Sequence, residues 1–383
     1  MKKGTMIAAL VAAFAILGAG TAEANVGTPT LDVDTTKVAQ SLETALGGGN
    51  TVGYAYAIAE NGVLAKTGAG GKARLDKDID FTPYTRLDIM SATKNVVAAA
   101  LLKVTEAAGL TPDHQIWPYL PPDMRAGADP SWQRLRIRDL LGHTSGVGQM
   151  ETDPANEADK PKMNQLYDGL KFMMTKPVGA GSSYKYANTN YSYARVVLPR
   201  LWHLTDPGRG VPEWIGPNSS QWTLYYVNEK LFTPAGLPWI TCLASNPDTA
   251  ALSYNLADPA AGGSLFQLSG KNFEACPSYR GLHMSAMDMV RWQVYLRHGT
   301  IVSPTVRSWM DSLDLGWRPH SVYTFLPDGA EAHGGGYTSG GRSTVTCHAK
   351  FPGNIEVSLV ANSQIKSGTH PCAIAAAAVK SGS

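Results

Sequence analysis

The feature that most constrains this chain is a serine placed immediately before a long apolar helix. The segment 91–94, Ser-Ala-Thr-Lys, is followed by the apolar run 95–102, which is typical of a buried helix. The same Ser-x-x-Lys spacing recurs at 182–185 and 363–366, but neither of those segments precedes such a run. We therefore expect Ser91 to lie at a helix start, where free backbone N–H groups favour developing negative charge.

A serine one helical turn before a lysine has a chemical use. The spacing places the Ser91 hydroxyl and the Lys94 amine on one helix face, within hydrogen-bond reach. An amine in that position can activate a serine without the histidine of a Ser-His-Asp triad. The competing interpretation is a capped helix start with a solvated lysine.

The N-terminal segment has the pattern of a secretory signal peptide, residues 1–24. Lys2 and Lys3 supply its positive charge, residues 6–20 its apolar stretch, and Ala-Glu-Ala at 22–24 a small-x-small cleavage site. The apolar stretch is too short to span a bilayer, so we expect cleavage near Asn25 rather than an uncleaved anchor. The mature chain, residues 25–383, is then secreted or periplasmic.

Composition excludes several classes of function. A hydrophobic content of 44% with 17% charged residues describes a globular chain, and no later segment is apolar enough to span a membrane. A net charge of +2 with scattered Lys and Arg favours no nucleic-acid partner. The chain has no Cys-x-x-Cys or His-x-x-x-His spacing, so we expect no metal site and no cofactor.

Four cysteines in an exported chain predict two disulfides, with three possible connectivities. The neighbour pairings Cys242–Cys276 and Cys347–Cys372 are favoured because each closes a loop of moderate length. Buried free thiols are the alternative.

The distribution of elements predicts an α/β (α+β) fold, with an antiparallel sheet flanked by helices and an inserted helical lobe. A helix is expected over 34–46, and Asn-Gly at 61–62 predicts a hairpin turn between two strands. Helical signals dominate the middle of the chain, and an apolar helix is predicted near its end. The predicted strands are 51–59, 63–68, 323–326, 333–337, 342–350 and 355–360, and the last helix is 373–380.

Two further stretches complete a recognisable set. Tyr186 and Asn188 lie in a loop before the helix-like run 192–201, and His-Gly-Gly-Gly at 333–336 lies on a predicted strand. With Ser91 and Lys94, these stretches resemble the serine β-lactamase and penicillin-binding-protein superfamily, in the branch of class C β-lactamases, D-alanyl-D-alanine peptidases and esterases. Three other segments also resemble that branch, at 137–146, 231–237 and 281–289.

The resemblance implies a fold and a set of roles. An α/β lobe (about 25–110 and 290–383) and a helical lobe (about 111–289) would enclose the site, and His143 would be structural. Ser91 would form the acyl-enzyme, and Tyr186 would pass the proton to the leaving group, with Lys94 tuning it. Either Lys94 or Tyr186 could take the first proton. The resemblance assigns substrate binding to a second set: Asn188, His333, Gly334, Gly335 and Gly336, with the N–H groups of Ser91 and Gly336 binding the oxyanion.

One departure from the family pattern concerns the substrate. Gly334 stands where β-lactamases carry a hydroxyl that helps bind the substrate carboxylate. Unless the side chain of Thr338, Ser339 or Arg342 binds the carboxylate instead, the site suits esters, or amides without that carboxylate. The predicted function is a secreted serine hydrolase that cleaves ester or amide bonds of a small-molecule or peptide-like acyl substrate. Its alternatives are a transacylase or D-amino-acid-type amidase, a β-lactamase or D,D-carboxypeptidase, and a non-catalytic binder of cell-wall peptides.

Overall fold

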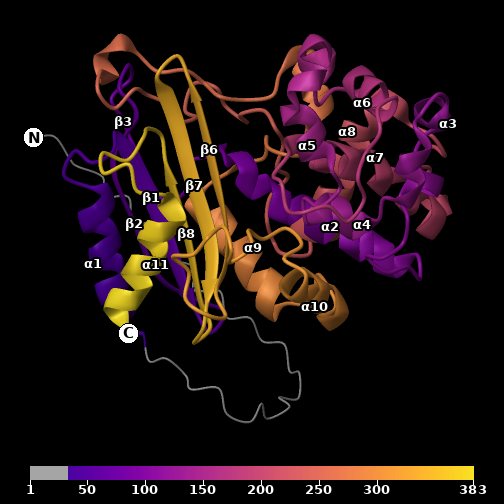
Figure 1. The fold of residues 1–383 in the computed structure, drawn as a ribbon. Helices are drawn as coiled ribbons and strands as arrows, with labels where there is room; N and C mark the ends of the chain where they lie inside the picture. Colours follow the sequence, from indigo (N-terminus) through magenta and orange to yellow (C-terminus); the bar gives the residue numbers. More distant parts are fainter. Residues whose placement is uncertain (1–32) are drawn as a thin grey trace, which may run out of the picture. The chain divides into compact units, whose positions relative to one another are not determined.

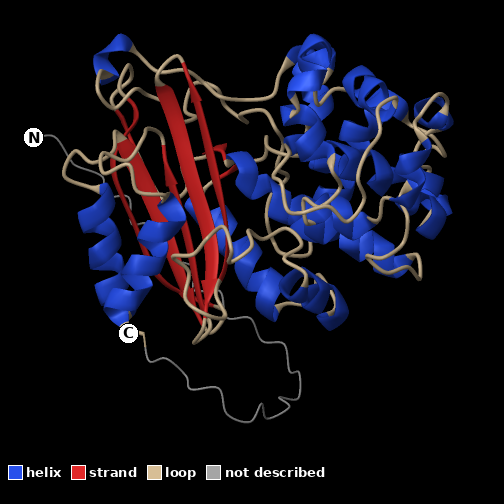
Figure 2. Cartoon of the chain, viewed as in Figure 1, coloured by secondary structure: helices blue, strands red, loops and turns tan. Residues whose placement is uncertain are grey.

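The centre of the fold is a six-stranded antiparallel sheet built from both ends of the chain (Figures 1 and 2). It is described by a computed structural model that covers residues 33–383, so the predicted signal peptide lies outside the described residues. In spatial order the strands are β3 (Ile79–Asp80), β2 (Val63–Arg74), β1 (Gly53–Glu60), β8 (Ile355–Ala361), β7 (Arg342–Phe351) and β6 (Glu331–Ser339). This arrangement confirms the predicted mixed fold with an antiparallel sheet.

The central strand β1 is buried on both faces. Tyr54, Tyr56 and Ile58 point to the side covered by the terminal helices, whereas the alternate alanines, such as Ala55 and Ala57, point to the larger core on the other side. Because successive side chains of a strand face opposite ways, both sets must be apolar. This explains the continuous apolar run in the sequence.

Strand β2 is longer than predicted. The turn is the expected two-residue one, with positive φ at Asn61 and Gly62. The strand does not stop near residue 68, however, but continues through the glycines to Arg74. A side chain at Gly68 would collide with the ring of Tyr56, so the glycine makes room for an aromatic residue of the neighbouring strand.

The C-terminal strands follow the prediction with one exception. Strands β6, β7 and β8 form where expected, but residues 323–326 form turns rather than a strand. Tyr323 is buried there, and its hydroxyl accepts a hydrogen bond from the Gly334 N–H at 3.1 Å. Tyr323, the first residue of the predicted strand, therefore packs inward from a loop.

Helices cover both faces of the sheet. Helices α1 (Thr35–Leu46) and α11 (Pro371–Gly382) pack together on one face, and α9 (Ala286–His298) contacts β1, β7 and β8 on the other. Helix α2 (Thr93–Ala107) packs against α7 (Asn188–Thr205), which in turn packs against α8 (Ser219–Val227). The remaining α-helices are α3 (Pro122–Arg125), α4 (Ile137–Leu141), α5 (Val147–Thr152), α6 (Tyr167–Met174) and α10 (Pro304–Ser312).

A short two-stranded sheet joins distant segments near the start of α2. Strand β4 (Leu87–Asp88) pairs with β5 (His283–Met284), so residues almost 200 positions apart meet just before Ser91. The described residues cluster as one compact unit, and the proposed division into two lobes remains a prediction.

Both disulfides predicted from the sequence are present. Cys242 bonds Cys276, and Cys347 on β7 bonds Cys372 on α11. No described cysteine is free. The two bonds are consistent with a protein of an oxidising compartment.

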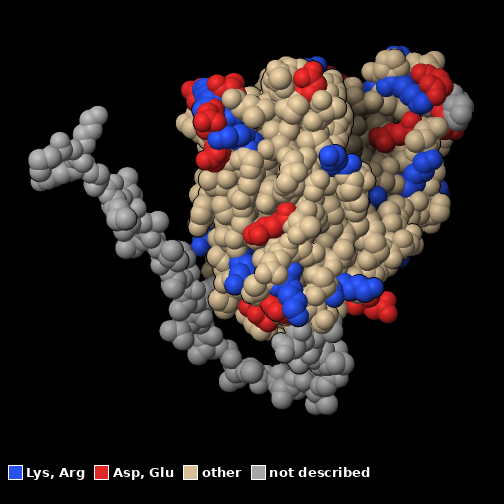
Figure 3. All heavy atoms as spheres, turned by 90° about the vertical axis from the view of Figure 1, so that its left-hand side faces the viewer, with Lys and Arg blue, Asp and Glu red and all other residues tan. Residues whose placement is uncertain are grey.

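The described surface carries charges of both signs. On the face seen in Figure 3, positive and negative side chains lie in small mixed groups. Lys72, for example, pairs with Asp78 and Asp80. Within residues 33–383, no helix is long and apolar enough to cross a membrane.

Candidate active site

Ser91 lies on a short turn that is held by a buried carboxylate. It belongs to the 3₁₀ turn Met90–Ala92, and α2 begins at Thr93. Met90 has a positive φ of 52°, which is costly for a residue with a side chain. The buried Asp88 carboxylate holds this conformation because Oδ1 accepts hydrogen bonds from the N–H groups of Met90 and Gly281. Asp88 is therefore a positioning residue that the sequence did not suggest.

The structure brings four of the predicted site residues together. The Tyr186 hydroxyl lies 2.8 Å from Ser91 Oγ, and Lys94 Nζ lies 3.2 Å from the same oxygen. Lys94 Nζ also donates to Asn188 Oδ1 at 2.9 Å and to the Tyr279 carbonyl at 2.8 Å. Ser91, Tyr186 and Asn188 are partly exposed, whereas Lys94 is fully buried.

The surroundings of Lys94 favour its neutral form. Burial lowers the pKa of Lys94 well below its ordinary value, and the Arg318 guanidinium lowers it further, while Asp88 acts the other way. A neutral amine has two N–H donors and one lone pair. The two donors match Asn188 Oδ1 and the Tyr279 carbonyl, which leaves the lone pair for the Ser91 hydroxyl.

The surroundings of Tyr186 also favour its neutral form, which for a phenol is the protonated one. Burial raises the pKa of its phenol, and the Ser91 hydroxyl and Arg318 only partly offset this shift. The group is a protonated donor at neutral pH, which agrees with its 2.8 Å contact to Ser91 Oγ. The electrostatics thus favour Lys94, rather than Tyr186, for the first proton.

His143 supports the loop that carries Tyr186. Its ring centroid lies 4.5 Å from that of Tyr186, and its Nδ1 accepts a hydrogen bond from the Ala187 N–H. Its carbonyl accepts from the Lys185 N–H. Burial lowers the pKa of His143 well below its ordinary value, so the ring is neutral. His143 contacts Tyr186 rather than Ser91 in the described structure, which makes it a positioning residue.

The glycines of β6 allow the strand to touch the Ser91 turn. A side chain at Gly335 would collide with the Ile89 carbonyl and with Thr346 Oγ1, so only glycine lets the two backbones meet. Gly336 is exposed, and a Cβ there would make only ordinary van der Waals contacts. At Gly334, a Cβ would collide with His370 and the Tyr323 hydroxyl, on the face toward α11. This packing explains why no hydroxyl-bearing residue stands at position 334.

His333, which is predicted to bind substrate, is buried in the structure. Its side chain is 1% exposed, and Nδ1 hydrogen-bonds the Gly316 carbonyl at 2.9 Å. Burial, with Lys94 as a further contribution, lowers the pKa of His333 well below its ordinary value. The neutral ring is therefore almost fully covered, and its contact with a substrate stays a prediction.

Arg318 is the cation that the sequence analysis missed. Its guanidinium lies 4.3 Å from the ring centroid of Tyr186 and 5.5 Å from that of Tyr323. Within residues 33–383 it forms no ion pair, and its buried Nε has no hydrogen-bond partner. The only local signal was a charged residue directly after Leu-Gly-Trp at 315–317.

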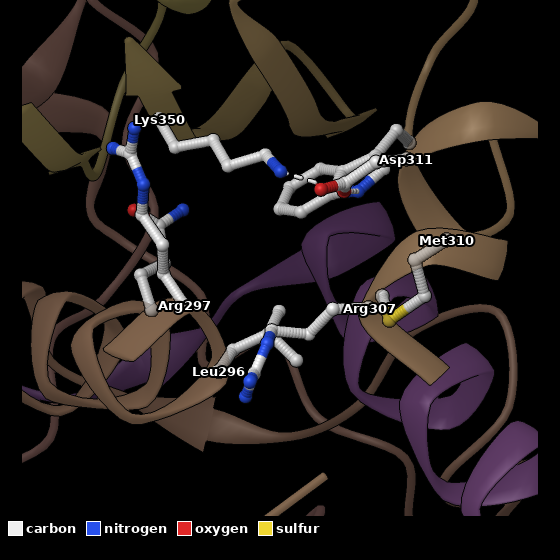
Figure 4. A pocket seen from close by; sticks show the side chains of 8 residues that line it. Leu296, Arg297, Arg307, Met310, Asp311 and Lys350 are labelled. Carbon is white, nitrogen blue, oxygen red and sulfur yellow. Dashed lines mark hydrogen bonds and ion pairs between the residues drawn. The ribbon is translucent and has the colours of Figure 1, made fainter. Parts of the chain in front are cut away.

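Two cavities lie away from these residues. One, of about 30 Å³, is lined by side chains that include Leu296, Met310 and Lys350, whose amine pairs with Asp311 (Figure 4). It holds no more than a water or two. A more open pocket of about 290 Å³ lies beside Tyr84. Neither is lined by Ser91 or Lys94, and the described residues contain no cluster suited to a metal ion.

Fold and site together define a class. A serine at a helix start, contacted by a lysine and a tyrosine beside a glycine-rich strand, is the arrangement of the serine acyl hydrolases related to penicillin-binding proteins. The Beta-lactamase family model matches residues 38–345, and the chain belongs to this family, whose members are serine acyl hydrolases.

Solved structures share the fold at low sequence identity. The octameric penicillin-binding protein homologue from Pyrococcus abyssi aligns with a TM-score of 0.65 and 20% identity, over 90% of this chain and 76% of that one. EstCE1, a hydrolase with promiscuous acyltransferase activity, has the same score and identity, with 90% and 98% coverage. The D-amino acid amidase from Ochrobactrum anthropi SV3 has a TM-score of 0.62 and 18% identity, with 90% and 98% coverage.

Curated relatives match a shorter part of the chain. The protein flp of Staphylococcus aureus (strain MW2) is 23% identical over 186 residues. That match covers 48% of this chain and 37% of the relative, so the chain spans well under half the length of the curated relatives it matches.

Proposed function

We propose that the chain is an exported serine acyl hydrolase that cleaves ester or amide bonds through an acyl-enzyme on Ser91. The observation that carries this proposal is the Ser91 hydroxyl, held 3.2 Å from a buried amine and 2.8 Å from a phenol. Export is supported by the sequence pattern of residues 1–24 and by the two disulfides.

The chemical step follows from the charges of these groups. The Ser91 proton passes to Lys94 Nζ while Oγ bonds the carbonyl carbon, and the negative oxygen is held by the N–H groups of Ser91 and Gly336. The bond to the leaving group then breaks, and that group takes a proton through Tyr186. Water attacks the acyl-enzyme in the second half, releases the acid and restores the Ser91 hydroxyl.

A panel of substrates tests the proposed reaction. Purified protein is assayed with p-nitrophenyl esters, p-nitroanilides, nitrocefin and peptides ending in D-alanine. We expect turnover of esters to exceed that of nitrocefin at least tenfold. Rapid nitrocefin turnover would contradict the inference drawn from the missing hydroxyl at Gly334.

Tyr186→Phe should separate substrates by their leaving groups. A p-nitrophenolate leaves without a proton, whereas a p-nitroanilide must be protonated. We therefore expect the kcat/KM of a p-nitroanilide to fall by about 10²–10⁴-fold and that of the ester with the same acyl group to fall about tenfold less. Tyr184→Phe is the matched control because its buried hydroxyl has no hydrogen-bond partner. Equal losses on the two substrates would remove Tyr186 from the role of proton donor.

One observation favours a second candidate function, a carboxypeptidase-like activity. Arg318 places a guanidinium without an ion-pair partner among the described residues 4.3 Å from the ring centroid of Tyr186, the residue proposed to protonate the leaving group. A leaving group with a free carboxylate could form charge-assisted hydrogen bonds with this guanidinium. Arg318, rather than Thr338, Ser339 or Arg342, would then replace the binding group missing at Gly334.

Arg318→Met distinguishes the two candidates. Two peptides are compared that differ only in ending in D-alanine or D-alanine amide. If Arg318 binds a carboxylate, the variant loses about 10- to 100-fold in kcat/KM on the free acid alone. If Arg318 acts only through the pKa of Lys94, both peptides lose activity equally. Arg209→Met, in an ion pair with Glu229, controls for the lost charge.

A further inference from the structure

Strand β6 carries an exposed aromatic surface just beyond Gly336. Tyr337 follows Gly336 and is 43% exposed. Its ring packs against that of Phe266 with 5.1 Å between centroids and an angle of 72°. These two rings, Tyr337 and Phe266, are called the aromatic edge below.

The aromatic edge is held in a fixed position relative to Ser91. The Arg280 guanidinium lies 4.7 Å from the centroid of Tyr337 and pairs with Asp88, the residue that also holds the Met90 N–H. The backbone carbonyl of the preceding residue, Tyr279, accepts a hydrogen bond from Lys94 Nζ. One short segment therefore connects the amine, the serine turn and the aromatic edge.

The charge of Arg280 does not make this surface an anion site. Its side chain is 13% exposed, and the Asp88 carboxylate that neutralises it is fully buried. The surface offered beside Gly336 is therefore mainly aromatic, whereas the unpaired cation near Ser91 is Arg318.

Arg318 and the aromatic edge lie toward opposite ends of β6. The backbone N–H of Arg318 donates a hydrogen bond to the Ala332 carbonyl near the start of the strand. Tyr337 lies five residues further along. At about 3.3 Å per residue, Ala332 and Tyr337 are roughly 16 Å apart along the strand. Gly335, which lies against the Ser91 turn, falls between them.

This layout orients a substrate. The leaving group must meet Tyr186, whose ring contacts Arg318, so it departs toward the start of β6. The acyl group that remains on Ser91 then extends the other way, over the exposed backbone of Gly336. Its far end reaches the aromatic edge.

We propose that Tyr337 and Phe266 bind the acyl group of the substrate and select aromatic or bulky apolar acyl groups over small ones. The inference rests on the proposed acyl-enzyme at Ser91 and specifies its substrate class. Two aromatic rings stack favourably with a third and exclude water from it, and an apolar pocket typically discriminates by about 10- to 200-fold.

A series of esters with one leaving group tests this proposal. p-Nitrophenyl acetate, butyrate, phenylacetate and 3-phenylpropionate are compared, each kcat/KM being divided by the rate of alkaline hydrolysis of the same ester. We expect the phenylacetate-to-acetate ratio to be at least about 10 in the wild type. In Tyr337→Ala and in the double variant with Phe266→Ala, we expect it to fall close to 1. Tyr84→Ala, which removes a tyrosine that is 72% exposed, is the matched control.

The outcomes separate this inference from the proposed function. If Ser91 becomes acylated but the ratio is near 1 in the wild type, or is unchanged in both variants, the aromatic edge does not bind the acyl group. If no ester acylates wild-type Ser91, as judged by intact mass, the proposed function itself fails. Labelling of Ser91 by a fluorophosphonate at the wild-type rate verifies that each variant is folded.

Discussion

Ser91→Ala should lower kcat for every substrate by about 10⁵–10⁶-fold, the loss that follows removal of a serine nucleophile. The side chain is partly exposed, and the turn around it is held by Asp88 and Gly335 rather than by the hydroxyl. The variant should therefore fold normally. The measurement is the hydrolysis rate of p-nitrophenyl esters, with circular dichroism to verify the fold.

The chain contains a matched control for this substitution. Ser182→Ala removes a serine with the same spacing to a lysine, but that hydroxyl bonds the Thr144 carbonyl instead of an amine. We expect Ser182→Ala to retain full activity. Residual activity of Ser91→Ala within tenfold of the wild type would show that another group is the nucleophile.

Lys94→Met should also remove most activity, by about 10³–10⁶-fold in kcat. Methionine fills the buried space but has no lone pair for the Ser91 proton. Lys366→Met, at the exposed lysine of a third Ser-x-x-Lys segment, is the control and should remain active. An active Lys94→Met enzyme would assign the first proton to Tyr186.

The same substitution should change how stability depends on pH. The pKa of Lys94 is lowered in the folded state, so the unfolded chain binds one more proton between that value and the ordinary pKa near 10.5. The free energy of unfolding of the wild type, relative to Lys94→Met, therefore rises with pH across this window. The slope is about 1.4 kcal/mol per pH unit, and it vanishes above the ordinary pKa.

Urea unfolding of the two proteins at pH values from 6 to 10.5 measures this difference. Other titrating groups are common to both proteins and cancel. Parallel curves would mean that Lys94 is protonated in the folded protein, which would contradict its role as the base.

The parts of the fold with local signals were predictable from the sequence. Asn61 and Gly62 determined the hairpin turn, and spacing favoured the correct cysteine pairs. The errors arose where a neighbour in space decides. The extension of β2 depends on Tyr56 lying over Gly68, and Tyr323 bonds Gly334 from a loop rather than from a strand.

The candidate site was predictable where sequence motifs carry the resemblance to the family, and not where it depends on packing in space. The resemblance supplied Ser91, Lys94, Tyr186 and Asn188, which the structure brings into direct contact. It did not supply Arg318, whose position beside Tyr186 depends on the packing of segments more than 100 residues apart. Nor could it show that the imidazole of His333 is buried and bonded to the Gly316 carbonyl.

The central claim is that one hydroxyl carries the acyl group. Wild-type protein is mixed with a p-nitrophenyl ester, quenched in acid within milliseconds to seconds, digested and analysed by mass spectrometry. We predict one acyl group per chain, on the peptide that contains Ser91. An acyl group on another residue, or rapid turnover without any covalent acyl group on Ser91, would contradict this account.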